Sequence, residues 1–221
     1  MRRLLIILAL AATGCGPSYY YQPAEQADAS VSGHPAARYV VPPGSAKGDV
    51  RVSSFGVTDV RLSEDDEPIR SLHVRLVVAN EDGEEAWAVD TRALRVQFAG
   101  FEGAAAPAFA NATDSNMPVV VVPRGGSTTI DVYYPLPESL RGAKDLPQFD
   151  VIWSVRTEDR VVTQRTPFER RAIQPPPSTF AYGWGAGAYP YWWYDPFFYP
   201  RTVVVPAAPA RPRVYYYGYP R

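Results

Sequence analysis

The stretch from Ser71 to Asn80, SLHVRLVVAN, alternates apolar and polar side chains as a β-strand does when only one of its faces is buried. Every second residue of this stretch is apolar and is expected to face a core: Leu72, Val74, Leu76 and Val78. His73 and Arg75 fall on the opposite face, which the alternation assigns to solvent. The stretch therefore predicts a half-buried strand with an exposed histidine.

Seven further segments around this stretch also read as strands. Three alternate as clearly: ALRVQF (93–98), STTIDVYYPL (127–136) and QFDVIWSVR (148–156). In DVRVSSFGVTDVRL (49–62) the inward phase shifts near Gly56, as a β-bulge would cause. The others are WAVD (87–90), MPVVVV (117–122) and RVVTQRTPF (160–168). Turn residues separate the segments, among them Asp82-Gly83, which suits a hairpin. With no convincing helical period, the pattern predicts an all-β, antiparallel two-sheet sandwich.

In the order of its segments, this region resembles the immunoglobulin-like domains of bacterial envelope proteins. The resemblance rests on three stretches: VRLVVANEDGEEAWAVD (74–90), LRVQF (94–98) and VVVPRGGSTTIDVYYPLP (120–137). It implies an immunoglobulin-like β-sandwich over residues 48–171. The disulfide of antibody domains is missing, because the chain has one cysteine. Such domains serve many unrelated roles, so the resemblance implies no particular activity.

The amino terminus has the pattern of an export signal over residues 1–14. Arg2 and Arg3 precede an apolar run at 4–12, and small residues follow it. A bilayer-spanning helix needs about 20 apolar residues, so this run predicts a cleaved leader rather than a permanent span.

Ala12-Thr13-Gly14-Cys15 resembles the lipobox of bacterial lipoproteins, with Ala12 in place of the usual leucine. The resemblance implies cleavage before Cys15, a diacylglycerol thioether on its sulfur and acylation of the new amine. Three acyl chains would anchor the protein to a membrane essentially permanently. By analogy with sorting rules, Gly16 after the cysteine favours the outer membrane, at its periplasmic face or surface. An ordinary signal peptide with a chance cysteine is the alternative.

Composition divides the rest of the chain into three regions. Residues 15–47 combine the candidate lipidated cysteine with a segment rich in proline, alanine, serine and glycine, which predicts a flexible tether. Residues 48–171 form the predicted sandwich. Residues 172–221 form a low-complexity tail rich in proline, tyrosine and tryptophan.

The sequence contains no recognisable catalytic or metal-binding constellation, so we expect no catalytic residue, metal site or cofactor. Only two histidines are present, and His34 lies in the predicted tether without a cysteine or acidic partner at ligand spacing. Acidic segments at 64–67 and 80–85 offer oxygen donors for calcium but lack the full spacing of a calcium loop. A glycan-cleaving envelope enzyme stays open as the alternative, because carboxylate pairs are assembled by tertiary structure.

The tail holds fifteen of the 29 aromatic residues and ten of the 23 prolines. Prolines at this density oppose regular helices and central strands, yet the rings should find a surface that covers them. That surface is the sandwich itself, with RTVVVP (201–206) adding an edge strand, or a partner protein, or a lipid interface or cell-wall glycan. The candidate binding residues are Trp184, Tyr191, Trp192, Trp193, Tyr194, Phe197, Phe198 and Tyr199.

Net charge excludes one class of partner. The formal charge is −1 for the whole chain and becomes −3 when Arg2 and Arg3 are removed with the leader, so nucleic acid is not an expected partner. The sequence thus predicts a non-catalytic, lipid-anchored envelope protein. Its partners are the membrane through the anchor, and an envelope protein or cell-wall glycan through the tail.

Overall fold

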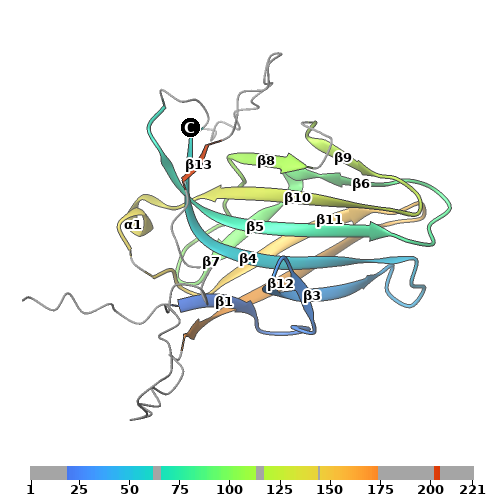
Figure 1. Ribbon diagram of the computed structural model, residues 1–221, viewed down its shortest axis with the longest axis horizontal. Helices are drawn as coiled ribbons and strands as arrows, with labels where there is room; N and C mark the ends of the chain where they lie inside the picture. Colours follow the sequence, from blue (N-terminus) through green and yellow to red (C-terminus); the bar gives the residue numbers. More distant parts are fainter. Residues whose placement is uncertain (1–18, 62–65, 113–116, 144, 174–201, 205–221) are drawn as a thin grey trace, which may run out of the picture.

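The protein folds as two β-sheets packed face to face, with very little helix (Figure 1). The computed structural model describes residues 19–61, 66–112, 117–143, 145–173 and 202–204. All strand pairs but one are antiparallel, which confirms the all-β, two-sheet prediction. Among these residues no helix is long and apolar enough to cross a membrane.

The first sheet runs from β1 to β9. Its strands, in spatial order, are β1 (Tyr19–Pro23), β12 (Val161–Ala172), β11 (Phe149–Arg156), β6 (Trp87–Asp90) and β9 (Val119–Val122), and β7 (Arg95–Phe98) also pairs with β11. The 3₁₀ turn η1 (Thr91–Ala93) separates β6 from β7.

The second sheet runs from β2 to β8. Its strands, in spatial order, are β2 (Ala29–Val31), β3 (His34–Val41), β4 (Gly48–Arg61), β5 (Ile69–Asn80), β10 (Gly126–Pro135) and β8 (Phe109–Ala112). β13 (Thr202–Val204) pairs in parallel with the last part of β4, which agrees with the alternative in which RTVVVP (201–206) adds a strand to the sandwich. The short helix α1 (Glu138–Arg141) follows β10.

The core includes the residues that alternation assigned to it. Leu72, Val74, Leu76 and Val78 of β5 are fully buried, as are Val151, Trp153 and Val155 of β11 in the facing sheet. The Trp153 ring lies 5.3 Å from that of Tyr39, and its indole N–H donates to Thr166 Oγ1 at 3.0 Å. All eight segments with strand patterning form strands.

The bulge expected near Gly56 is present in β4. The register between β4 and β5 shifts between Ser54 and Gly56, so that Phe55 is an extra residue opposite β5. Gly56 has a φ of 75°, a value that favours glycine. The bulge turns Phe55 onto the outer face of the second sheet, beside His73.

Residues 19–47 differ from the prediction, because they form β1, β2 and β3 rather than a flexible tether. Tyr21 is buried and its hydroxyl donates to the Leu146 carbonyl at 3.0 Å, while Ala37 and Val41 are fully buried. Those prolines of the predicted tether that are described fall at strand ends and in loops. A proline needs no ladder hydrogen bond there, so it does not prevent pairing.

A second difference concerns Asp82-Gly83, which does not turn a hairpin. β5 pairs with β4 and β10, whereas β6 belongs to the other sheet, so residues 81–86 cross between sheets. Asn80 organises this crossing: its side-chain oxygen accepts from the Gly83 N–H at 3.1 Å and its amide donates to the Glu85 carbonyl at 2.8 Å.

The two ends of the sandwich are distinct. The near end is where β1 begins and β4, β10 and β12 end, and α1 and β13 lie there (Figure 1). The far end is where β4, β10 and β12 begin. Tyr19 pairs with Ala172 at the near end, so the start of β1 and the end of β12 meet at one corner of the first sheet.

Candidate functional site

The predicted lipidation and binding residues lie outside the described residues. These are Cys15 and the tail residues Trp184, Tyr191, Trp192, Trp193, Tyr194, Phe197, Phe198 and Tyr199. Of the residues weighed for chemistry, His34, His73 and the second acidic segment are described. The described residues offer two candidate sites, one on the outer face of the second sheet and one at the near end.

The first candidate is a row of five rings that crosses the outer face of the second sheet. Neighbouring ring centroids are 3.9 Å apart for His34 and Phe55, 4.9 Å for Phe55 and His73, 4.5 Å for His73 and Tyr133, and 5.7 Å for Tyr133 and Phe109. The rings come from β3, β4, β5, β10 and β8. We call them, with Arg75 and Asp131, the histidine cluster; it contains both histidines of the chain.

His73 is buried at 8% exposure, so the prediction that it faces solvent is wrong. The ring of Phe55, pushed outward by the bulge, covers one side of the imidazole, and Tyr133 stacks on the other at an interplanar angle of 16°. Alternation identified the face correctly. It could not show that neighbouring strands cover that face with aromatic rings.

Asp131 is the charged centre of the histidine cluster. Its Oδ1 lies 2.7 Å from His73 Nε2 and accepts from Arg75 Nε at 2.7 Å, while its Oδ2 accepts from Arg75 Nη2 at 3.0 Å. Burial opposes ionisation of this carboxyl, but hydrogen bonds from His73 and Arg75 outweigh it and hold the pKa of Asp131 below its ordinary value. The carboxylate therefore stays charged at neutral pH.

Burial raises the pKa of Tyr133 to about 12, and the nearby charge of Asp131 adds to the rise. Its phenol is therefore neutral wherever the protein is folded at ordinary pH. A neutral ring stacked on the His73 imidazole suits a packing role better than a proton-transfer role.

The hairpin of β2 and β3 carries His34 onto the histidine cluster. Its two-residue turn, Ser32-Gly33, has φ values of 50° and 84°, as the tight turns of hairpins require. Ser32 Oγ accepts from Arg75 Nη1 at 3.0 Å, which holds the turn against β5. Burial lowers the pKa of His34, and the nearby His73 and Arg75 lower it further.

This geometry favours a structural role for the histidine cluster. Nucleophilic catalysis would need a serine hydroxyl bonded to the histidine of an acid–histidine pair. The pair of Asp131 and His73 is present, but the hydroxyl of Ser32 is bonded to Arg75 rather than to His73. The His73 ring is stacked on Tyr133 and lies against the tilted ring of Phe55, so its faces are not free to receive a sugar ring. The cluster instead fixes the β2–β3 hairpin to the second sheet.

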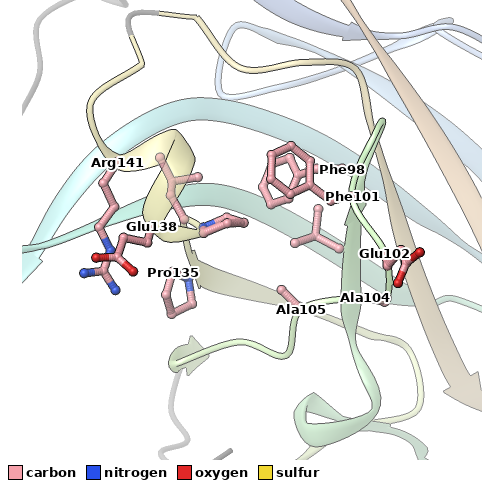
Figure 2. A pocket seen from close by; sticks show the side chains of 12 residues that line it. Phe98, Phe101, Glu102, Ala104, Ala105, Pro135, Glu138 and Arg141 are labelled. Atoms are coloured by element: carbon pink, nitrogen blue, oxygen red, sulfur yellow. The ribbon is translucent and has the colours of Figure 1, made fainter.

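The second candidate is a pocket of about 530 Å³ at the near end, between the sheets (Figure 2). It is bounded by β7, the loop that follows it, the end of β10 and α1. The lining residues are Val96, Phe98, Phe101, Glu102, Gly103, Ala104, Ala105, Pro135, Leu136, Pro137, Glu138 and Arg141. Arg70 of β5 holds the α1 wall by donating to the carbonyls of Arg141 and Ala143, both at 2.8 Å.

The near-end pocket is apolar inside and polar at its rim. Phe98 and Leu136 are buried, and the ring of Phe101 lies 6.4 Å from that of Phe98. Glu138 and Arg141 lie on one side of the rim and Glu102 on the other (Figure 2). Both carboxylates are exposed. The pocket thus lacks the buried, facing pair of carboxyl groups that the glycan-cleaving alternative requires.

In the parts of the chain that are described, no three histidine, cysteine, aspartate or glutamate side chains converge to bind a metal ion. In the second acidic segment, the Asn80 oxygen accepts from a backbone N–H rather than facing outward. Glu158 lies beside this segment, pairs with Lys47 and accepts from the N–H groups of Glu84 and Glu85. Residues 64 and 65 of the first acidic segment lie outside the described ranges.

Comparison with known proteins gives no family for this chain: no family model, no curated protein and no solved structure matches it.

Proposed function

We propose that this protein is a non-catalytic, lipid-anchored protein of the bacterial cell envelope. The observation that supports it best is where the first strand begins. β1 starts at Tyr19, so only residues 16–18 separate it from Cys15. Because one residue extends a chain by at most about 3.6 Å, a lipidated Cys15 would hold the near end within about 14 Å of the bilayer. The sandwich would then lie directly on the membrane.

The same corner would present the tail to the envelope. Tyr19 pairs with Ala172, after which the tail begins. The Arg170 guanidinium lies 4.5 Å from the centre of the Tyr19 ring, and Arg171 is exposed next to it. Tyrosine and arginine suit the headgroup region of a membrane. We propose that the tail binds an envelope protein or the cell-wall glycan close to the membrane, and that nucleic acid is not a partner.

We further propose that the sandwich is immunoglobulin-like. The neighbours β4-β5-β10-β8 and β12-β11-β7 follow the strand orders ABED and GFC of that fold, which supports the assignment. Four additions depart from it. The β2–β3 hairpin extends the sheet beyond β4, and β1 pairs antiparallel with β12. The paired strands β6 and β9 extend the first sheet beside β11, and β13 pairs in parallel with β4.

The anchor is tested by Cys15→Ser with Ala12→Leu as the matched control. The control variant restores the residue usual at the first lipobox position and should be lipidated at least as well as the native chain. Cys15→Ser should move the protein from the membrane pellet to the soluble fraction. Mass spectrometry of the native product should find an acylated amino-terminal cysteine. Retention of Cys15→Ser in the pellet after a high-salt wash, or an intact Met1, would contradict the anchor.

The tail is tested in the soluble Cys15→Ser chain. Replacing Trp184, Trp192 and Trp193 together by serine should abolish sedimentation with purified cell-wall sacculi and cross-linking to envelope proteins in living cells. Replacing the exposed Val119 and Val121 by serine is the control, because these side chains lie on β9 at the far end. Equal sedimentation and equal cross-linking of both variants would exclude the tail as the binding element.

A further inference from the structure

The described chain leaves the first sheet and returns to the second sheet at the same end of the sandwich. β12 ends at Ala172, beside the start of β1, and β13 begins at Thr202, beside Asp59 near the end of β4. Both points belong to the near end. Residues 174–201 therefore connect the end of β12 in one sheet to the start of β13 in the other, and both of these points lie at the near end, as α1 does (Figure 1).

The connection formed by residues 174–201 is longer than is needed to cross from one sheet to the other. Packed sheets lie about 10 Å apart, and a chain covers about 3.3 Å per residue when extended, so a handful of residues would close the distance. Residues 174–201 are several times longer than that. The surplus is enough to extend sideways over α1 and the pocket before returning to β4.

The chemistry of the pocket matches the side chains in the connection. Residues 174–201 include Trp184, Trp192 and Trp193 among many rings. Phe98 and Phe101 already meet edge to face, an arrangement that a further aromatic ring can extend. At the rim, Arg141 offers a guanidinium that can lie on a ring face, and Glu138 offers an acceptor for an indole N–H or a phenol.

We propose that an aromatic side chain from residues 174–201 occupies the near-end pocket of the same chain. The pocket then serves as the docking site of the tail, between its exit at β12 and its return at β13. This proposal does not depend on lipidation of Cys15. A ring held in the pocket is withheld from a partner, so occupancy of the pocket limits how many tail rings are free to bind.

Disulfide trapping in the full chain tests the proposal. The only cysteine is Cys15, so a Cys15→Ser background has no thiol of its own. Ala104→Cys places a thiol on the exposed pocket wall, and Ala186→Cys, Ala188→Cys or Asp195→Cys places the second beside the tail rings. Glu102→Cys replaces Ala104→Cys if the latter lowers the melting temperature. Val121→Cys, exposed at the far end, is the control partner.

We expect at least one tail position to link to the pocket thiol within the same chain at least tenfold faster than to the control thiol. Equal rates at all three tail positions would overturn the proposal. Links that form between chains, at a rate that rises with concentration, would assign the pocket to a second copy. Binding of the probe anilinonaphthalene sulfonate to the full chain, abolished by Ala105→Trp, would mean that the pocket is open to a free ligand. Links between chains and such binding of the probe would each overturn the proposal.

Discussion

The two ends of the sandwich are built differently. At the far end Trp87 is fully buried and two glycines lie close to its ring: a Cβ on Gly48 would lie 2.9 Å from the ring and 2.0 Å from the Ala79 carbonyl oxygen. At the near end a pocket of about 530 Å³ lies between the end of β10 and β7, and its rim is exposed. The far end has no room for an added methyl group, whereas the near end has room for a ring.

This contrast indicates where the molecule can bind something. Glu158, Lys47 and Asn80 tie the loops of the far end to one another, so that end closes the core. The near end combines incomplete packing with both chain exits. Binding groups are commonly carried by loops on a rigid scaffold, and the near end fits that description while the far end acts as the scaffold.

The largest expected difference in stability is between a variant that lacks an aromatic ring at the far end and one that lacks a ring at the near end. Trp87→Ala should lower the free energy of unfolding by about 3–5 kcal/mol, because it leaves a large cavity in a fully buried site. Phe101→Ala, in the partly open wall of the pocket, should cost clearly less. Chemical denaturation of both variants measures this. Equal losses would show that the near end is packed as tightly as the far end.

Adding a methyl group should lower the stability of the protein at the far end but not at the near end. Gly83→Ala would place its Cβ 2.1 Å from Asn80 Oδ1 and 3.0 Å from Trp87 Nε1, and should destabilise by about 1–3 kcal/mol. Gly142→Ala, at the near end, has a negative φ and meets nothing within 4 Å. It should be neutral or stabilise by up to about 1 kcal/mol through the unfolded state. Thermal unfolding compares the pair, and a harmless Gly83→Ala would contradict the close packing.

Replacing a carboxylate by an amide should lower stability at the far end but not at the near end. Glu158→Gln weakens the pairing with Lys47 and the bonds from two backbone N–H groups, and should cost about 1–2 kcal/mol. Glu102→Gln, on the exposed rim of the pocket, should leave stability unchanged. Urea denaturation at neutral pH measures both. Indifference to Glu158→Gln would mean that the far-end loops are held by packing alone.

The smallest expected effect is on the outer face, away from both ends. Because the pKa of His34 is lowered in the folded state, the unfolded chain takes up the proton first as the pH falls. The contribution of this group is complete above its ordinary pKa of about 6.5 and is lost as the pH drops below that value toward the folded pKa. Stability should therefore decrease in weak acid, and less so in His34→Gln. The urea midpoints of both proteins at pH 7.5 and 5.5 measure this. An equal decrease of the midpoint in both proteins between these pH values would contradict the prediction.

The sequence predicted those features that depend on neighbours in the chain. Strand patterning, most of it alternation, located eight of the strands, and the phase shift at Gly56 located the bulge. It did not reveal the short strand β8 (Phe109–Ala112). It did not reveal β1 to β3, because their prolines lie where strands end and so resemble a linker. It also misjudged His73, since the rings that cover it, Phe55 and Tyr133, are brought there by strand pairing. The near-end pocket joins segments some thirty residues apart, which no local pattern describes.

The pairing of Tyr19 with Ala172 has a mechanical consequence. If the amino terminus is held and the segment directly after Ala172 is pulled, the force acts on Tyr19 and Ala172, two adjacent residues of an antiparallel pair. Such a load opens the ladder like a zipper, breaking its hydrogen bonds in succession from Tyr19 toward Pro23 rather than all at once. β1 would detach under low tension, and the Tyr21 hydroxyl would lose its bond to Leu146. The remaining strands, loaded only afterwards, would be spared.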